Sequence, residues 1–399
     1  MLASVAKRFK DSDDQSAVVS QLPSYNEVRC QLSRHRAVRC TPIPDPLCLP
    51  DELRTTLRGR SVAEDDVNWN EPFLLHSGQN GKLYVFCAKS ELAVIHDSEY
   101  LVCDGTFEMS PDTAYQVYTI HGFCNGEGMA LLWALLPNKT TAMYVEMFSA
   151  LRSAMVAEFG EVGKKTFLVD FELAAINAIQ QTNPESIVKG CSFHFRQSLM
   201  RRIQNLGLKS LYESDDCPEV RSWIRLIMSM TMLPVFTVPL AWSYLKDPPL
   251  TGQSAVDAKT QAFALYFDAT WMTGDYPPTL WSHFDNLGPR TTNLAEGWHS
   301  GLNNRFGMPH PSLRSFLDWL QKCQFEVQCR LIQLLAGRPP KQQLPAYKRV
   351  DEQIAATKLR YNINISALFV HVFPRDDVWP MFYNYTLEYL GHISHLVGA

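Results

Sequence analysis

The sequence predicts an α/β fold in which a mixed sheet is flanked by helices, with an all-helical insertion before the last helix of the sheet domain. Three observations lead to this prediction. Strand-like runs rich in aromatic and aliphatic residues fill 100–136, helical and strand patterns alternate over 141–208, and only helical patterns occupy 205–285. The 399 residues, 46% of them hydrophobic, are enough to bury one large core or two.

The N-terminal part, residues 1–65, is polar and punctuated by proline. This composition predicts a mostly extended linker with a short helix near 25–36. After Pro72, two apolar runs flank the turn-rich segment 77–81 (SGQNG), a pattern typical of a β-hairpin. The folded body is therefore expected to begin at about residue 66.

Three strand-like runs follow at 100–109, 115–123 and 129–136, each bounded by turn residues. The period then changes to four over 141–159, which predicts one helix. Its apolar face is formed by Met143, Met147, Leu151, Met155 and Phe159.

Residues 164–172 then read as a buried strand, 172–181 as a helix, and 186–193 as a short strand that leads into the helical stretch 195–208. The resulting order β-β-β-α-β-α-β-α is the order of an RNase H-like domain. We expect that core over 66–204.

The helical insertion is expected over 205–285, with clusters such as WIRLIMSMTMLPVF. The sheet domain resumes over 286–337, where a long amphipathic helix ends at Gly337 before two prolines. A C-terminal helical tail occupies 338–399.

Composition argues against secretion and membrane insertion. The N-terminus lacks the apolar stretch of a signal peptide, and the longest uncharged segment, 226–245, is broken by Pro234 and Pro239. Ten cysteines without dense regular spacing predict reduced thiols inside the cell. The net charge of −4 gives no overall basic field, so contacts with a polyanion would need local Lys/Arg patches.

Three carboxylates stand out, each with two readings. Asp104 interrupts an apolar strand run and is either a ligand-binding group or the start of an Asp-Gly turn. Asp170 ends a buried strand, where α/β sheets place their ligands, yet it also suits a helix N-cap. Glu296 fits a capping box with Asn293 as the cap. Glu172 is a rival to Asp170 as a ligand.

Four short motifs follow one another along the chain: DGTF at 104–107, DFELA at 170–174, a C-x-x-H pair, and NLAEGWH at 293–299. In this order and spacing, about 95–325 resembles the Mutator-like element (MULE) transposase domain. The segment from about 20 to 95 is similar to the region that joins a FLYWCH zinc finger to this domain in animal members. The sequence printed here contains no such finger.

The resemblance implies a DDE transposase in which Asp104, Asp170 and Glu296 form the catalytic set. Such a set of hard oxygen ligands suits two Mg²⁺ or Mn²⁺ ions. The expected activity is DNA strand cleavage followed by strand transfer, on double-stranded DNA, in the nucleus, by a homo-oligomer. The alternative is a domesticated, non-catalytic protein that binds DNA or chromatin.

Cys191 and His194 form the family-like C-x-x-H pair, for which we expect a role in supporting the site, with His194 counted among the catalytic residues. A structural zinc ion is the weaker alternative, because the only distant candidate for a second pair is His392 with His395. A buried cysteine beside a helix-start histidine remains a third possibility. His299 lies three residues after Glu296, hence on the same helix face.

Phosphate contacts are expected from five basic residues: Arg196, Arg201, Arg202, Arg305 and Arg314. Tryptophans 271, 281 and 298 are either stacking partners for splayed bases or core residues.

Overall fold

The computed structural model describes residues 49–57, 71–78, 82–306, 309–342, 344–370 and 375–398. By its contacts the chain divides into two compact units. The first, here called the sheet unit, comprises Met1–Val188 and Thr292–Lys341. The second, the helical unit, comprises Lys189–Thr291 and Gln342–Ala399. The helix expected at 25–36 lies outside the described residues.

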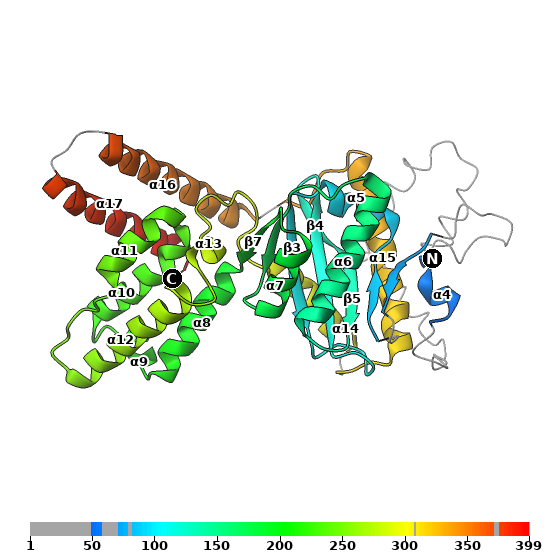
Figure 1. Ribbon diagram of the computed structural model, residues 1–399, viewed down its shortest axis with the longest axis horizontal. Coiled ribbons are helices and arrows are strands. Elements are labelled where there is room, and N and C mark those ends of the chain that lie inside the picture. Colours follow the sequence, from blue (N-terminus) through cyan, green and yellow to red (C-terminus); the bar gives the residue numbers. More distant parts are fainter. Residues whose placement is uncertain are drawn as a thin grey trace. The chain divides into compact units, whose positions relative to one another are not determined.

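A seven-stranded mixed sheet forms the centre of the fold (Figure 1). In spatial order its strands are β1 (Leu74–Ser77), β2 (Tyr84–Phe86), β5 (Glu127–Leu136), β4 (Gln116–Cys124), β3 (Tyr100–Thr106), β6 (Thr166–Val169) and β7 (Ile187–Gly190). From β3 onward the chain order of strands and helices is the predicted β-β-β-α-β-α-β-α, which is confirmed. The expected hairpin is also confirmed, since β1 pairs with β2 antiparallel.

Strand directions follow from the connections between the strands. A loop over 107–115 joins β3 to β4, a two-residue turn joins β4 to β5, and both pairs are antiparallel. The helix α6 (Thr141–Phe159) lies between β5 and β6, and the return brings β6 alongside β3 in parallel. As a result, β3 and β6 end at the same edge of the sheet, here called the carboxyl edge.

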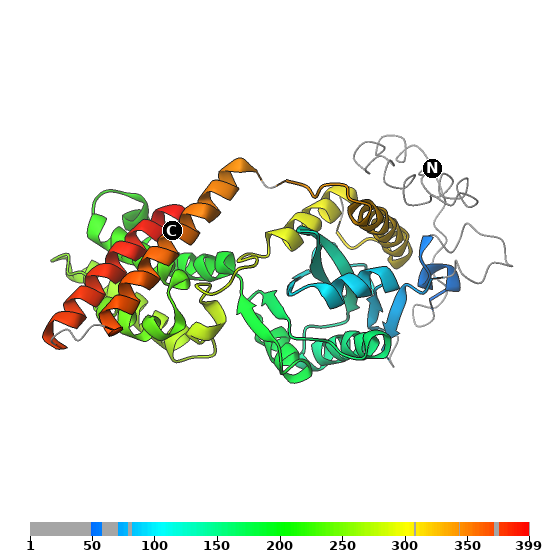
Figure 2. The same cartoon turned by 90° about the horizontal axis from the view of Figure 1, so that it is seen from above.

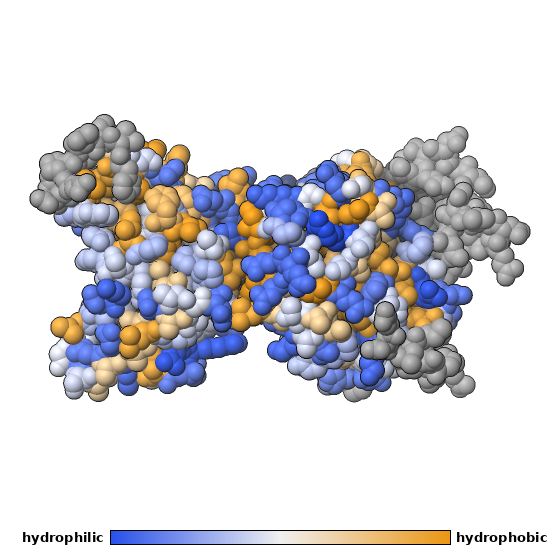
Figure 3. Space-filling model, in the orientation of Figure 1, coloured by the Kyte–Doolittle hydropathy of each residue, from blue (hydrophilic) through white to orange (hydrophobic). Residues whose placement is uncertain are grey.

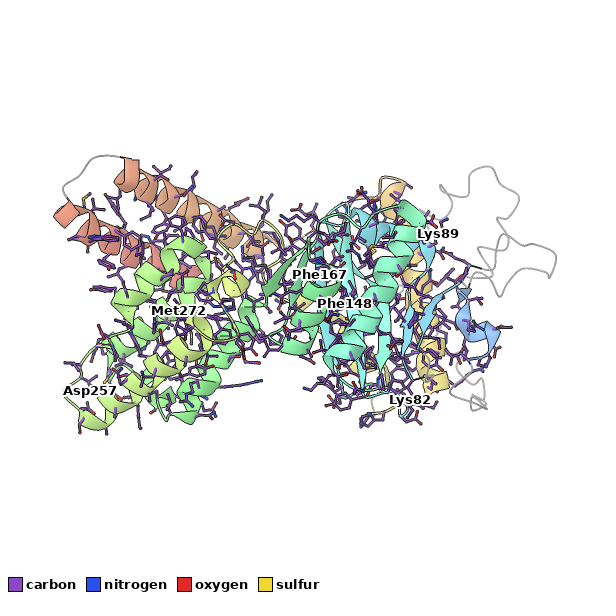
Figure 4. The ribbon with its side chains drawn as sticks, in the orientation of Figure 1. Lys82, Lys89, Phe148, Phe167, Asp257 and Met272 are labelled. Carbon is purple, nitrogen blue, oxygen red and sulfur yellow. The ribbon has the colours of Figure 1, made fainter. Side chains whose placement is uncertain are left out.

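Helices cover both faces of the sheet (Figure 2). On one face α6 buries Phe148, whose ring lies 5.8 Å from that of Phe167 on β6 (Figure 4). On the other face α14 (Asn293–Phe306) packs Ala295 against the middle of β3 and β6. The other helices of this unit are α4 (Asp51–Arg54), α5 (Lys89–Asp97), α7 (Leu173–Thr182) and α15 (Leu313–Leu335).

The bounds of α6 agree with the periodicity of the sequence. All five of its predicted apolar positions are buried or half-buried at a spacing of four, from Met143 to Phe159. The helix ends at Gly160, whose φ of 84° is in the left-handed region that glycine adopts readily.

A glycine sets how closely α14 approaches the sheet. A Cβ atom on Gly128 of β5 would lie 2.4 Å from Cδ2 of Leu294. A larger residue there would force the Leu294 side chain to shift. Glycine at this position therefore lets the first turn of α14 pack closely against β5.

Helices alone make up the described part of 205–285, which confirms the expected all-helical character of that segment. The helical unit contains α8 (Ser192–Asn205), α9 (Lys209–Glu213), α10 (Pro218–Ser229), α11 (Val238–Leu245), α12 (Ser254–Phe267), α13 (Pro278–Trp281), α16 (Pro345–Val370) and α17 (Arg375–Leu396). By contacts, α8 and the two C-terminal helices thus group with the insertion. The proposed domain limits, at 66–204 and 286–337, stay predictions.

An aromatic cluster forms the core of the helical unit. Phe195 of α8 stacks on Trp281 at 5.2 Å between ring centroids and meets Trp271 edge-on at 4.7 Å. Both tryptophans are buried. Of the two readings of these tryptophans, the core reading is therefore the one that the structure supports.

Polar and apolar residues alternate over the visible face of each unit (Figure 3). Among the described helices, none combines the length and the apolar character needed to cross a membrane.

Candidate active site

Asp104 lies inside strand β3 and is buried, with 8% of its surface exposed. It pairs with Thr119 of β4, and Gly105 pairs with Tyr118, so the strand continues through the Asp-Gly dipeptide. The alternative that this dipeptide forms a hairpin turn is therefore wrong. A buried carboxylate in a central strand is costly unless its charge is compensated, which marks this position as unusual.

Gly105 is needed for packing. A Cβ atom there would lie 1.9 Å from Nε2 of Gln116. That amide also donates to the hydroxyl of Tyr144 at 3.0 Å, so it has little freedom to move away. The small residue after Asp104 thus leaves room for a buried polar contact on the α6 face of the sheet.

Asp170 follows the last residue of β6 and is partly exposed. The parallel register pairs Val102 of β3 with Leu168 of β6. Asp104 lies two residues beyond this pair within β3, and Asp170 lies two residues beyond it, just after the end of β6. Burial, and then the charges of Asp104 and Asp170, raise the pKa of Cys103, the neighbour of Asp104 in the chain. Because side chains two residues apart on a strand share a face, Asp104 leaves the sheet on the face where Ala295 packs against Val102 and Leu168, and a register continued to Asp170 would bring that carboxylate to the same face.

The N-cap reading of Asp170 needs correction. The helix α7 begins at Leu173 and its N-cap residue is Glu172. Asp170 nevertheless accepts a hydrogen bond from the Glu172 backbone N–H at 3.3 Å. It supports the turn into the helix without being the cap residue itself.

Glu296 lies in the first turn of α14, one residue after Ala295. The helix begins at Asn293, so Asn293 is not the N-cap and the proposed capping box is wrong. Instead the hydroxyl of Thr292 donates to Oε1 of Glu296 at 3.5 Å. The packing of Ala295 on β3 and β6 places this turn on the same face of the sheet as the two aspartates.

His299, one turn after Ala295, meets Asp104. Its Nδ1 atom lies 3.6 Å from Oδ2 of Asp104, and its Nε2 atom lies 3.5 Å from the hydroxyl of Thr119. That hydroxyl also lies 3.1 Å from Nε2 of His121 and donates to the Asp104 carbonyl at 3.3 Å. A continuous buried polar chain thus runs from Asp104 through His299 and Thr119 to His121.

Both histidines of this chain are neutral near pH 7. Burial lowers the pKa of His299 to about 4 and that of His121 to about 3, the latter with a contribution from the neighbouring His299. Neutral rings next to a carboxylate orient it without cancelling its charge. The two histidines therefore contribute no positive charge beside Asp104 near pH 7.

Glu172 adds a third carboxylate at the carboxyl edge. Its Oε1 atom is buried and receives no hydrogen bond. Burial, followed by the charge of Asp170, raises the pKa of Glu172, and the charge of Lys139 and a hydrogen bond with Tyr144 oppose that rise. Crowded carboxylates with an unsatisfied buried oxygen are costly, and a hard cation would relieve that cost.

The donor atoms at this edge fit Mg²⁺ or Mn²⁺ in their chemistry, since all are carboxylate oxygens. As they stand, however, no three His, Cys, Asp or Glu side chains of the described residues are grouped closely enough to hold a metal ion. β3 and β6 end at the same edge, and the acidic side chains near it would have to move closer together to share an ion.

Cys191 and His194 belong to the helical unit, whereas the carboxylates belong to the sheet unit. Cys191 is buried at the N-cap position of α8, and His194 lies in the first turn of that helix. No described group of three His, Cys, Asp or Glu side chains that could hold a metal ion includes this pair, and the zinc alternative stays a prediction. The supporting role of His194 stays a prediction.

Two of the expected phosphate contacts in α8 are engaged within the protein. The partly buried Arg196 donates to the carbonyl of Val397, and Arg202 lies 5.0 Å from the ring of Tyr266. Arg201 is exposed.

The two expected contacts in the sheet unit also have acidic neighbours. Arg314 donates to Glu52 at 3.1 Å and lies 3.8 Å from Asp318, which offsets its charge. Burial raises the pKa of the half-buried Glu326 to about 7, and the charge of Arg305 opposes that rise. Contacts between any of these arginines and phosphate remain predictions.

Sequence reasoning missed Thr119 and His121. A signal was present, because these two polar residues lie two apart in the otherwise apolar strand segment YTIH and so share one face. Only the pairing of Asp104 with Thr119 shows that this face is the one that carries the aspartates.

Comparison with protein families gives one match. Residues 100–198 match the model of the MULE transposase domain, about a quarter of the chain. The match includes Asp104, Asp170, Glu172, Cys191 and His194, and it ends before Glu296 and His299. No curated protein matches the chain.

Proposed function

We propose that this chain is a DDE-type Mutator-like transposase with an RNase H-like catalytic core that cleaves DNA strands and transfers them to a target. The observation that carries the proposal is the parallel pairing of β3 with β6, because a register continued two residues past Val102 and Leu168 would set Asp104 beside Asp170. Both residues lie inside the segment that matches the MULE transposase domain. The predicted order of strands and helices around them supports the RNase H-like assignment.

Asp104 and Asp170 would hold Mg²⁺ or Mn²⁺, with Glu296 as the third ligand and Glu172 as its rival. A divalent cation held by these carboxylates would supply Lewis-acid chemistry, lowering the pKa of an attacking hydroxyl and offsetting charge on the phosphate. The protein's own part is positioning. Neutral His299, held by the Thr119 hydroxyl, limits the orientations of the Asp104 carboxylate, and the Glu172 backbone N–H does the same for Asp170.

The substrate of this proposal is double-stranded DNA, held by local basic residues because the net charge is −4. We further propose a nuclear location and a homo-oligomer that brings two element ends together. These parts of the proposal follow from the family of the matched segment.

The second candidate is a non-catalytic DNA-binding or chromatin-binding protein derived from a transposase. One observation favours it: the described acidic and histidine side chains form no three-membered metal group as they stand. Under this alternative the carboxylates would have only structural roles.

A plasmid-nicking assay separates the two. Purified chain is incubated at low salt with supercoiled plasmid and Mg²⁺, Mn²⁺ or EDTA. We expect nicking that needs the metal and is lost in Asp104→Asn and Asp170→Asn, while DNA binding stays within about twofold of wild type, because lysine and arginine dominate affinity. An amide keeps the size of the carboxylate but loses the charge that holds the cation.

Two further variants identify the third ligand. Glu296→Gln is expected to abolish nicking, and Glu172→Gln to reduce it only in part. The reverse pattern would move the third ligand to α7. Metal-dependent nicking that persists in both aspartate variants would exclude the proposed site.

A further inference from the structure

An exposed aromatic pair lies where three strands reach the carboxyl edge of the sheet. Phe107 directly follows β3, and Tyr115 directly precedes β4. Lys139 lies three residues beyond the end of β5. Because β3 and β5 run together and β4 runs opposite to both, all three residues leave the sheet at the same edge.

These three side chains contact one another. The rings of Phe107 and Tyr115 meet edge-to-face, with centroids 5.3 Å apart, and the Nζ atom of Lys139 lies 5.7 Å from the Phe107 centroid. Phe107 is 40% exposed and Tyr115 is 49% exposed. Two large aromatic rings held together in solvent are unusual for a surface that binds nothing.

The pair lies at the end of the strand that carries Asp104. Phe107 is three residues from Asp104 along the chain, and β3 and β6 run parallel, so both strands end at this edge of the sheet. A strand of DNA whose phosphate reaches the carboxylates would therefore pass these rings. This inference rests on the proposed function for the identity of its ligand.

We propose that Phe107 and Tyr115 form a stacking platform for an unpaired nucleobase next to the cleaved phosphate, with Lys139 contacting the adjoining phosphate. Aromatic faces stack on any base, so the contact needs no particular sequence. Lysine beside aromatic rings supplies the charge that a nucleotide, but not an apolar peptide, requires.

The surroundings favour a base over the backbone of a duplex. Glu108 and Asp112 are exposed in the loop between Phe107 and Tyr115. Their negative charges repel a row of phosphates laid across the loop, whereas a single uncharged base can lie on the rings. The platform therefore selects DNA with an unpaired end or an opened base pair.

Fluorescence of 2-aminopurine provides the test, because stacking on an aromatic ring quenches it. The full chain, in EDTA to prevent cleavage, is titrated with a blunt duplex and with a duplex that carries 2-aminopurine in a short single-stranded overhang. Wild type is expected to bind the overhang more tightly and to quench the probe.

Variants assign the effect to the rings. The double variant Phe107→Ala/Tyr115→Ala is expected to lose about tenfold in affinity for the overhang and most of the quenching, within the range of about 1–3 kcal/mol for stacking on one base. Its affinity for the blunt duplex should stay within about twofold of wild type. Tyr115→Phe keeps the ring and should behave as wild type, as should Phe236→Ala, which removes a 63% exposed ring in the helical unit.

The platform would be overturned if the double variant lost affinity equally for the blunt and the overhang duplex. Unchanged quenching of the probe by the double variant would also overturn it. So would a wild-type chain that binds blunt and overhang DNA alike. Plasmid nicking by the same preparation reports on the proposed function separately. If the protein nicks plasmid but does not prefer the overhang, the stacking platform is rejected and the proposed function stands. If it prefers the overhang but does not nick plasmid, the catalytic proposal is rejected and the platform stands.

Discussion

At the scale of single residues, the site depends on small and polar groups whose importance comes from their neighbours across the sheet. Asp104 is flanked in sequence by Cys103 and Gly105, neither of which suggests a site. Across the strand pair, however, it faces Thr119, and across the layers it faces His299. The sequence predicted the carboxylates, because they interrupt apolar runs, but their partners became visible only with the strand register.

Replacing Thr119 tests the buried polar chain. Thr119→Val leaves Nε2 of His121 without its hydroxyl partner, and we expect it to lower the free energy of unfolding by about 1–3 kcal/mol. Thr119→Ser keeps the hydroxyl, so its free energy of unfolding should fall by less. Urea denaturation measures both.

A second readout separates positioning of Asp104 from stability. Loss of an outer partner weakens metal binding, so Thr119→Val should need about tenfold or more Mg²⁺ for half-maximal nicking, while Thr119→Ser stays near wild type. If Val and Ser variants show the same Mg²⁺ dependence as wild type, the chain from Asp104 to His121 is structural only.

Gly105 offers a test of the local packing. In Gly105→Ala the new Cβ would overlap the Gln116 amide, and we expect a loss of about 1–3 kcal/mol in the free energy of unfolding. Gly301→Ala is the matched control, since a Cβ there meets nothing within 4 Å and alanine favours the helix. A Gly105→Ala protein as stable as the control would show that Gln116 moves aside freely.

At the scale of elements, the helices and strands of the sheet unit followed from periodicity, whereas the polar face of α15 did not. Gln321, Gln324 and Gln328 lie on one buried side of that helix. Read from the sequence, glutamines at this spacing suggest a solvated face. They are buried because their partners come from distant segments: Gln324 donates to Glu91 of α5 at 3.0 Å, and Gln321 donates to backbone carbonyls near α4.

Glu91 makes this buried contact sensitive to pH. Burial raises its pKa to about 7, from an ordinary value of 4.5. The folded protein therefore holds a proton that the unfolded chain has lost, and stability falls as pH rises between those two values. From pH 4.5 to pH 8 the carboxyl should cost on the order of 3 kcal/mol of unfolding free energy.

The variant Glu91→Gln removes this titration. Relative to wild type, we expect it to gain stability steadily as pH rises from 5 to 8, measured by urea denaturation at each pH. The buried histidines make stability rise with pH, which is the opposite of the effect of Glu91. Because both proteins contain these histidines, the difference between the two proteins reports on Glu91 alone. Glu99→Gln, at an exposed position, is the control. A constant difference between Glu91→Gln and wild type across this range would contradict the account.

At the scale of the whole molecule, the chain joins a sheet unit to a helical unit whose segments interleave in sequence. Patterns along the chain predicted the sheet and the helical character of 205–285, because periodicity is local. They did not predict that α8 and the C-terminal helices group with the insertion, because that depends on packing between distant apolar faces such as those around Phe195. The C-x-x-H pair lies in the helical unit for the same reason.

Locating the bound metal tests the central claim most directly. When Fe²⁺ replaces Mg²⁺, ascorbate and peroxide generate radicals that cut the polypeptide near the ion, and mass spectrometry of the fragments locates the cuts. We predict cuts beside Asp104 and Asp170 that excess Mg²⁺ suppresses and that Asp104→Asn abolishes. Cuts near Cys191 and His194 instead, or none that Mg²⁺ suppresses, would contradict a metal site at the carboxyl edge of the sheet.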